Sequence, residues 1–190
     1  MRNRRLSAAL ATTVVGLSIA SPAAAETQST QARASQACAG ADTMTTSVRR
    51  LKRAILCLHN VERRKAGLST LSWDRNLTGV ARKYSRAMVA GRFFSHYSAG
   101  RRDHMDRIAT SRYTPSVGCW TAGENLYSSV GNSTPRQMMA AWMGSRLHRQ
   151  NIRHGGWHDF GLGVTKRSTD GARGGLTVVA LFGLRTGRPC

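Results

Sequence analysis

The sequence lacks three features that would each assign it to a particular class of protein. No two of its four cysteines are separated by two residues, so it has no CxxC pair of the kind found in structural zinc sites. Beyond residue 25, no stretch is long and apolar enough to span a bilayer. No recognition motif for nucleic acid is present either. These absences argue against a structural zinc domain and a nucleic-acid-binding protein, and they predict no transmembrane segment after residue 25.

Acidic residues are scarce. The chain has 29 Lys and Arg against 9 Asp and Glu, which gives a formal net charge of +20 at pH 7. A field of this sign attracts anionic partners such as cell-wall polymers, acidic lipid surfaces or nucleic acid. The basic residues are scattered, however, and their longest cluster, over 49–53, falls on a predicted helix. A solvated basic surface is therefore an equally good interpretation, and nonspecific binding of anionic polymers stays open as one candidate function.

The first 25 residues are organised for export rather than for folding. Three arginines within the first five positions precede a weakly apolar stretch over 6–20 and a small-residue cleavage site of three alanines over 23–25. A membrane anchor would need about 18 apolar residues, whereas serine, threonine and glycine interrupt this stretch. We predict that residues 1–25 are a signal peptide, that cleavage before Glu26 lowers the formal charge to +17, and that the mature protein is secreted.

The mature chain of 165 residues is long enough to bury one hydrophobic core. Residues 26–37 are mostly Gln, Ser, Thr and Ala without apolar periodicity, which predicts a flexible leader, and the folded domain is expected over 38–190. Its even number of cysteines favours two disulfides, for which three connectivities exist. Cysteines near both ends of the domain favour Cys38–Cys57 and Cys119–Cys190, but the sequence does not decide between the three.

Periodicity predicts helices first and strands late. Apolar residues recur at helical spacing over 47–66, and a second helix is expected from Asp74 to a stop at Gly91. A short helix is predicted over 103–110, and a further one begins at Ser133 or Thr134 and continues through Met143, with its methionines in the core. Short β-branched runs over 160–165 and 176–182 predict an antiparallel pair, with another strand near 125–129. This order is typical of an α+β fold.

Several short motifs follow one another in a fixed order. They read Asn-x-x-Arg, Gly-Leu, Leu-x-Trp, aromatic-Ser-His, Arg-Ile, Gly-Glu-Asn and Trp-x-x-Ser-x-x-His-Arg-x-Asn-Ile. In this sequence their residues are Asn60, Arg63, Gly67, Leu68, Leu71, Trp73, Phe94, Ser95, His96, Arg107, Ile108, Gly123, Glu124, Asn125, Trp142, Ser145, His148, Arg149, Asn151 and Ile152. Together, over about 38–183, they resemble the CAP superfamily of cysteine-rich secretory, antigen 5 and pathogenesis-related proteins, in its compact bacterial secreted form.

The resemblance implies a fold and a site. The fold would be an α-β-α sandwich of about four helices around a small, mainly antiparallel sheet. The site would be a cleft that contains His96, Glu124 and His148 and that accepts a lipid-like or anionic cell-envelope ligand. Larger relatives have a second Glu and a second His in this cleft; Ser145 lies near the position of that Glu here, and the final strand has no histidine.

The three side chains also permit chemistry that can be judged from the residues. Two imidazoles and a carboxylate suffice to hold a divalent metal such as zinc with open positions, or to serve as base and acid. A purely structural interpretation is equally concrete, with His148 at a helix end and Glu124 in a buried polar network around Asn125. The other histidines, which lack a partner pattern, are expected at the surface or on helix sides; they are His59, His104, His154 and His158.

Three functions therefore compete at this point. The first is a non-catalytic extracellular binding module for a lipid-like or cell-envelope ligand. The second is a metal-dependent hydrolase of peptide or cell-wall substrates, for which a metal-activated water is the only route available because Ser95 and His96 are adjacent on an extended segment and point to opposite sides. The third is a nonspecific binder of anionic polymers. Whether the protein is an enzyme stays open.

Overall fold

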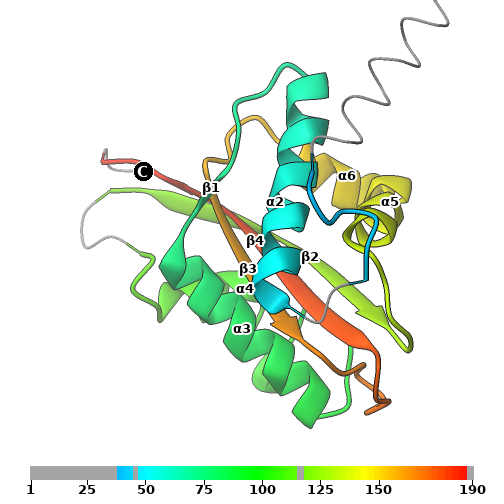
Figure 1. Cartoon of the computed structure of the whole chain (residues 1–190). Coiled ribbons are helices and arrows are strands. Elements are labelled where there is room, and N and C mark those ends of the chain that lie inside the picture. Colours follow the sequence, from blue (N-terminus) through cyan, green and yellow to red (C-terminus); the bar gives the residue numbers. More distant parts are fainter. Residues whose placement is uncertain (1–37, 45–46, 115–117, 188–190) are drawn as a thin grey trace, which may run out of the picture. The chain divides into compact units, whose positions relative to one another are not determined.

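The computed structural model describes residues 38–44, 47–114 and 118–187. The predicted signal peptide over 1–25 and the predicted leader over 26–37 lie outside the described residues, so both remain predictions. Helices and strands are labelled as in Figure 1. The helices are α2 (Val48–Lys65), α3 (Arg75–Ala90), the 3-10 turn η1 (Ala99–Arg101), α4 (His104–Ala109), α5 (Pro135–Gly144) and α6 (Arg146–Ile152). The strands are β1 (Ser72–Trp73), β2 (Trp120–Ser129), β3 (Asp159–Thr165) and β4 (Leu176–Arg185).

Local sequence signals set the starts of the long helices. Ser47 caps α2 by accepting a hydrogen bond from the backbone N–H of Arg50. Asp74 caps α3 in the same way, with bonds from the backbone N–H groups of Asn76 and Leu77. At α5, Thr134 and Gln137 form a reciprocal capping box, and Pro135 occupies the first turn. These starts agree with the predicted helices.

The sheet has four strands in the order β1-β3-β4-β2. The pairs β2–β4 and β3–β4 are antiparallel, which confirms the predicted pair over 160–165 and 176–182. The strand predicted near 125–129 is the second half of β2, which begins at Trp120. The two-residue strand β1 was not predicted; it pairs in parallel with the start of β3 and forms one edge of the sheet. The opposite edge is β2.

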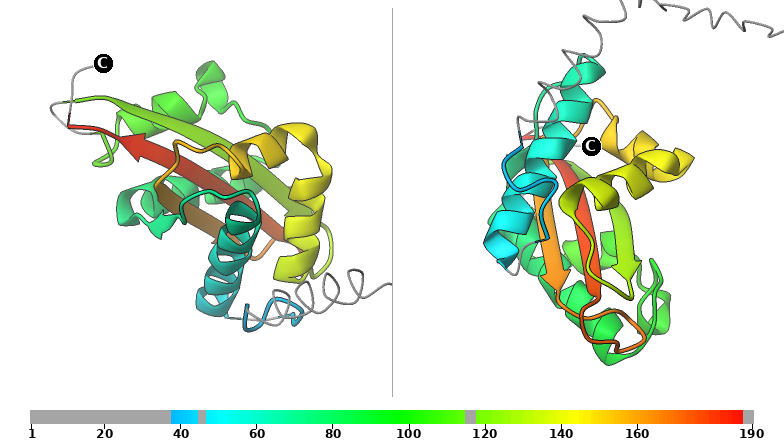
Figure 2. Two further views of the ribbon diagram at one scale, coloured as in Figure 1. Left: turned by 90° about the horizontal axis from the view of Figure 1, so that it is seen from above. Right: turned by 45° about the vertical axis from the view of Figure 1, so that its right-hand side comes forward.

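Helices cover both faces of the sheet, as the views in Figures 1 and 2 illustrate. On one face, Val179 and Leu181 of β4 share a hydrophobic cluster with Leu77 of α3 and Ile108 of α4. On the other face, the ring of Phe182 packs against His59 of α2, which also contacts a tryptophan of α5. Because neighbouring strand residues point to opposite faces, β4 is buried on both sides. The fold is therefore α+β, with helices on either side of a mainly antiparallel sheet.

Two glycines of β3 let α3 lie unusually close to the sheet. A Cβ at Gly161 would come within 2.4 Å of the backbone of Leu77, and one at Gly163 within 2.1 Å of the backbone of Ala81. Real side chains do not tolerate such distances, so only glycine permits this approach. The Gly-x-Gly spacing places both positions on the same face of the strand, toward α3.

The helix that the sequence predicted from Ser133 or Thr134 is followed at once by another. Ser145 has extended backbone angles, with φ −84° and ψ 127°, and it ends α5 and precedes α6. The guanidinium of Arg149 donates to the carbonyl of Met143 at this break. The described residues thus contain five α-helices where about four were expected, because the short helix α6 was not predicted as a separate element.

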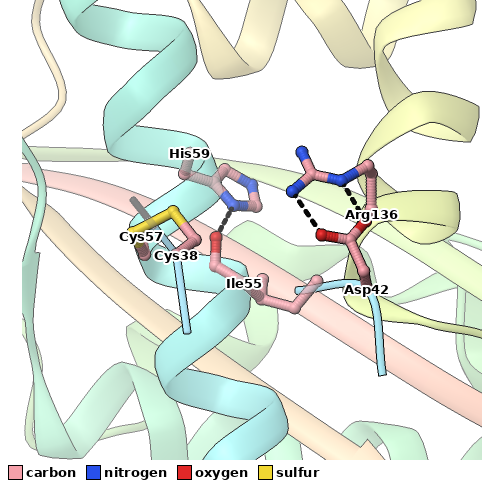
Figure 3. Close-up of a disulfide and its surroundings, with 6 residues drawn as sticks. All are labelled: Cys38, Asp42, Ile55, Cys57, His59 and Arg136. Atoms are coloured by element: carbon pink, nitrogen blue, oxygen red, sulfur yellow. Dashed lines mark hydrogen bonds and ion pairs between the residues drawn. A yellow bond between two sulfur atoms is a disulfide. The ribbon is translucent and has the colours of Figure 1, made fainter. Parts of the chain in front are cut away.

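The prediction for His59 was wrong. This residue is fully buried in α2, and its ring packs against the rings of Trp142, Phe160 and Phe182. Its Nδ1 lies 2.8 Å from the carbonyl oxygen of Ile55, one helical turn earlier (Figure 3). Burial lowers the pKa of His59 to about 4, because a charged ring would lose its hydration there. Periodicity identified the helix but not the aromatic rings that enclose this side chain.

One of the two predicted disulfides lies within the described residues. Cys38 is bonded to Cys57, which fixes the start of the domain to α2 (Figure 3). Cys119 is also disulfide-bonded. Cys190 lies outside the described residues, so the pairing Cys119–Cys190 remains a prediction. Beside the first disulfide, the guanidinium of Arg136 on α5 forms an ion pair with Asp42.

No helix in the described ranges has both the length and the apolar composition needed to cross a bilayer.

Candidate functional site

Glu124 is the centre of the candidate site. It lies on the edge strand β2, opposite Leu181 of β4. Directly paired residues on antiparallel strands point to the same face, so Glu124 faces α3 and α4. Its side chain is only 1% exposed. A carboxylate that is buried to this extent is stable only when other groups supply hydrogen bonds and positive charge.

Two side chains supply Glu124 with hydrogen bonds and positive charge. Nδ1 of His96 lies 2.8 Å from Oε1 of Glu124, and the guanidinium of Arg107 donates to Oε2 at 2.7 Å. With the carboxylate as acceptor, Nδ1 of His96 donates this hydrogen bond and Nε2 is left for a ligand. The His96 side chain is 46% exposed. The buried carboxylate therefore orients an exposed imidazole whose other nitrogen is available to a ligand.

Arg107 of α4 holds the segment around His96 as well as the carboxylate. Its guanidinium donates to the backbone carbonyl of His96 at 3.1 Å and to that of Arg102 at 2.9 Å. The same group lies 3.4 Å from the centre of the Tyr84 ring on α3, which adds a cation–π contact. The hydroxyl of Tyr84 in turn donates to the carbonyl of Ser95 at 2.7 Å. His96 is thus positioned through both its backbone and its ring.

His148 belongs to the other helical layer. It lies on α6, and its backbone carbonyl accepts a hydrogen bond from the side chain of Asn125 at 3.0 Å. Asn151 of α6 donates to the side chain of Asn125 at 2.9 Å and to the backbone carbonyl of Glu124 at 3.0 Å. These bonds fix α6 to β2. Asn125 and Glu124 are neighbours on one strand and point to opposite faces, so the site spans the free edge of the sheet.

The two histidines interact electrostatically across this edge. Burial lowers the pKa of His148, and the positive charge of His96 lowers it further. The structure thus places His96 in contact with Glu124 and His148 within electrostatic reach of His96. The lowered pKa of His148 favours its neutral ring, whose nitrogen lone pair can accept a hydrogen bond or bind a metal ion.

The fit of a metal ion to these residues can be judged from the bonds of Glu124. In the described part of the chain, no three His, Cys, Asp or Glu side chains are grouped as ligands for a metal. Both carboxylate oxygens of Glu124 already accept hydrogen bonds, one of them from a cation. Direct ligation by Glu124 would have to displace Arg107. If a metal ion were bound, the ligands left among the candidate residues would be His96 and His148, with Glu124 as the carboxylate that orients the first.

Exposed apolar side chains adjoin both histidines. Phe94 is 50% exposed and Tyr97 is 52% exposed, on either side of His96 along the chain, and Leu147 is 63% exposed next to His148. Large apolar side chains with this exposure are few among the described residues. Three of them lie within two residues of His96 or His148 in the sequence, so exposed apolar side chains occur on the same two segments as the histidines.

A basic cavity lies behind Arg107, between α3 and α4. Its volume is about 710 Å³, and its lining includes Tyr84 and the cations Lys83, Arg102, Arg107 and Arg112. A cavity of this size accommodates a small ligand. The side of the site that faces α3 and α4 is thus positively charged.

Sequence reasoning found His96, Glu124 and His148 but assigned no role to Arg107, Tyr84 or Asn151. Arg107 and Asn151 were present in the recognised motifs. A basic residue on a short helix is ordinarily a solvated one, and nothing in its spacing shows that it reaches a buried carboxylate. The hydroxyl of Ser95 accepts a hydrogen bond from the backbone N–H of Tyr97 at 3.0 Å, which is a structural role.

Comparisons with known proteins point to one family. The model of the cysteine-rich secretory protein family, CAP, matches residues 56–182. The uncharacterized protein YkwD of Bacillus subtilis is 32% identical over 120 residues, which cover 63% of this chain and 44% of that relative, so the chain spans less than half of its length. Among solved structures, an outer surface protein of Borrelia burgdorferi has the same fold at 23% identity and a TM-score of 0.62, over 74% of this chain and 96% of that chain. An extracellular protein of Bacillus anthracis with an SCP domain is 25% identical with a TM-score of 0.55, over 73% of this chain and 44% of that chain.

Proposed function

The chain belongs to the cysteine-rich secretory protein (CAP) family, and from this premise we propose that it is a secreted, non-catalytic binding module for an amphiphilic ligand of the cell envelope. The observation that carries the proposal is the exposure of Phe94, Tyr97 and Leu147 on the two segments that carry the histidines. A ligand with an acyl chain and a polar or anionic head group would contact both the exposed apolar side chains and the two histidines. Its chain would cover the exposed apolar side chains, and its head would meet the imidazoles.

The polar centre supports binding more directly than catalysis. Glu124 is engaged with His96 and Arg107, so its carboxylate serves to orient an imidazole. The Ser95 hydroxyl is held by local backbone. The proposed role of the site is therefore to recognise a head group by hydrogen bonds from His96 and His148. Secretion of the mature chain is part of the proposal, supported by the export signals at residues 1–25.

One observation favours a metal-dependent hydrolase as the second candidate. A buried carboxylate that holds Nδ1 of a histidine is the usual outer partner of a histidine that ligates zinc through Nε2. The ligands here would be His96 and His148. A zinc ion between them would lower the pKa of a bound water and polarise a carbonyl group. The residues of this chain would orient the imidazole of His96 through Glu124 and hold Glu124 in place through Arg107.

The test of the binding function uses the mature chain, residues 26–190, and dodecanoate as a soluble amphiphilic probe. We expect the double variant Phe94→Ser/Leu147→Ser to bind dodecanoate about tenfold more weakly by calorimetry, because each replacement removes apolar contact area. The matched control is Met44→Ser/Val130→Ser, which removes two similarly exposed apolar side chains away from the site. Equal loss in both double variants would contradict the proposal.

The same samples decide between binding and hydrolysis. Zinc affinity is measured by calorimetry near pH 7.5 and again near pH 5.5 for the wild type, His96→Ala and His148→Ala. A metal site would lose most of its affinity in either variant and at the lower pH, since ligation requires neutral imidazole. Mass spectrometry of cell-envelope fragments incubated with the zinc-loaded protein supplies the second readout. If the wild type forms cleavage products and His96→Ala does not, the protein is a hydrolase and the proposed non-catalytic function is wrong.

A further inference from the structure

A second candidate site lies at the opposite edge of the sheet. A groove of about 660 Å³ separates the start of α2 from the first half of α3, beside the edge strand β1. Its size is that of a ligand site. Val48 and the ring of Trp73, which is 41% exposed, contribute apolar surface. Glu124 lies on β2, at the other edge of the sheet. Arg75 and Gly79 of α3 line both this groove and the basic cavity behind Arg107.

Five cations line this groove. Three come from α2 and two from α3: Arg49, Lys52, Arg53, Arg75 and Arg82. None of the five side chains takes part in the ion pairs formed within residues 38–44, 47–114 and 118–187. Elsewhere the few acids of this chain are used in pairs with other cations, such as Arg185, Arg136 and Arg107. The groove therefore concentrates positive charge that the described residues do not neutralise.

The one acid in the described lining is already engaged. Oδ1 of Asp74 accepts the backbone N–H groups of Asn76 and Leu77, each at 2.8 Å, as the cap of α3. Its Oδ2 accepts a hydrogen bond from Arg185 at 3.0 Å. Asp74 is thus balanced by a cation outside the groove and does not offset the five that line it.

The cations of the two helices repel one another across the groove. Lys52 is partly buried, and its pKa is lowered first by that burial and then by the charge of Arg82. An anion between α2 and α3 would relieve this repulsion. Arg75 and Arg82 are seven residues apart on α3, which corresponds to about 10 Å along the helix axis. A single phosphate does not span that distance, whereas a chain of phosphates does.

We propose that this groove binds a linear polyol-phosphate polymer, whose phosphodiester groups pair with the arginines and whose carbon backbone lies against Trp73 and Val48. Four of the five cations are arginines, which bind phosphate oxygens through two parallel hydrogen bonds. The concave shape fits a chain better than the flat surface of a membrane. Among the described residues of the lining, Trp73 is the only aromatic, whereas sites for single-stranded nucleic acid stack successive bases on several aromatics.

The first test removes charge inside and outside the groove. Binding of a poly(glycerol phosphate) of defined length to the mature chain is measured by calorimetry at fixed ionic strength. Arg53→Gln/Arg82→Gln removes one groove cation from each helix and is expected to weaken binding about tenfold or more. Arg64→Gln/Arg173→Gln removes the same charge from two exposed positions outside the groove and is expected to stay within about twofold. Equal weakening of the two double variants would overturn the proposal.

The second test fills the groove without changing charge. Gly79 of α3 lines it, and a Cβ at this position would meet no atom within 4 Å. Gly79→Leu therefore fits the helix and raises its propensity, and we expect it to abolish most of the binding at unchanged net charge. Gly79 also borders the basic cavity behind Arg107, so the result is compared with that of Arg53→Gln/Arg82→Gln, whose two positions line only the groove. Gly79→Ala is the size control and should bind as the wild type does. Unchanged binding by Gly79→Leu would mean that the polymer is attracted by general surface charge and would overturn the site.

Two further probes separate the occupants. The wild type is also titrated with phosphatidylglycerol vesicles and with a single-stranded oligonucleotide that carries as many phosphates as the polymer. The proposal requires the polyol phosphate to bind most tightly of the three per phosphate. Tighter binding of the vesicles or of the oligonucleotide, lost in Arg53→Gln/Arg82→Gln, would assign the groove to a membrane surface or to nucleic acid instead.

Discussion

At the scale of single residues, the buried carboxylate of Glu124 determines how the candidate site is built. A charge without hydration is retained only with close partners, and here Arg107 supplies a cation while His96 supplies a ring N–H. Arg107 is a positioning residue, since it reaches the exposed ring of His96 only through the carboxylate of Glu124 and the backbone of His96. The orientation of His96 is therefore a consequence of the neutralisation of Glu124.

His59 gives a residue-scale prediction about pH. Its pKa is about 4 in the folded protein against an ordinary value of 6.5, so the unfolded chain takes up the proton first as the pH falls. The contribution of this neutral ring to stability is complete above pH 6.5 and is lost progressively between 6.5 and 4. Over that window the free energy of unfolding should fall by about 3 kcal/mol from this group alone.

The measurement compares the wild type with His59→Phe, which keeps an aromatic ring among Trp142, Phe160 and Phe182 but does not titrate. Urea unfolding is followed at several pH values from 7 to 4. The difference in unfolding free energy between the two proteins should change by about 3 kcal/mol over this range, while the carboxylates contribute equally to both. If the difference in unfolding free energy between the two proteins does not change with pH, then His59 has the same pKa in the folded and the unfolded protein.

At the scale of elements, the contact between α3 and β3 is unusually close. Two glycines make it possible, since a Cβ at Gly163 would lie 2.1 Å from the backbone of Ala81. The position of α3 that results from this close contact affects both candidate sites. The N-terminal half of α3 lines the basic groove, and Tyr84 on the same helix supports the segment that carries His96.

We predict that Gly163→Ala destabilises the protein by about 3 kcal/mol or more, because the added methyl group forces α3 away from the sheet. The control is Gly79→Ala on the outer side of the same helix, where a Cβ meets no atom within 4 Å. That change should stabilise the protein by up to about 1 kcal/mol. Urea unfolding of both variants tests the pair. Similar effects of the two substitutions would mean that helix propensity, and not the close approach, governs the contact.

At the scale of the whole molecule, the two free edges of the sheet have different character. Near the β2 edge, imidazoles occur with exposed apolar side chains on the same segments. The β1 edge is lined by cations that form no ion pair within the described residues. The cations of the groove stay without acidic partners in this part of the chain because the chain has few carboxylates and most of these take part in helix caps or in other ion pairs. These two edges are the surfaces that we propose to bind an amphiphile and a polyanion.

The disulfides give a prediction at this scale. Cys38 and Cys57 are 19 residues apart, and a cross-link of that length restricts the unfolded chain enough to add about 3 kcal/mol of stability. The double variant Cys38→Ala/Cys57→Ala should lower the urea midpoint accordingly. Alkylation of the denatured, unreduced wild type should add no label, since all four cysteines are predicted to be paired. Two labelled thiols in the wild type would contradict the predicted pairing.

The sequence by itself determined the long elements and named the residues of the candidate site. Caps and apolar periodicity are local properties, so α2, α3 and the β3–β4 pair could be predicted from Ser47, Asp74 and the β-branched runs. The motifs also named His96, Glu124 and His148. The Gly-x-Gly spacing of β3 was visible, although its reason was not.

Only the tertiary structure decided how these parts meet. That Glu124 is buried between His96 and Arg107, and that the basic residues of α2 and α3 share one groove, depends on packing between segments far apart in sequence. The same holds for the buried state of His59 and for the short strand β1. A residue's own sequence neighbourhood fixes its backbone preference, whereas its burial, its ionisation and its partners depend on elements that only the completed fold places beside it.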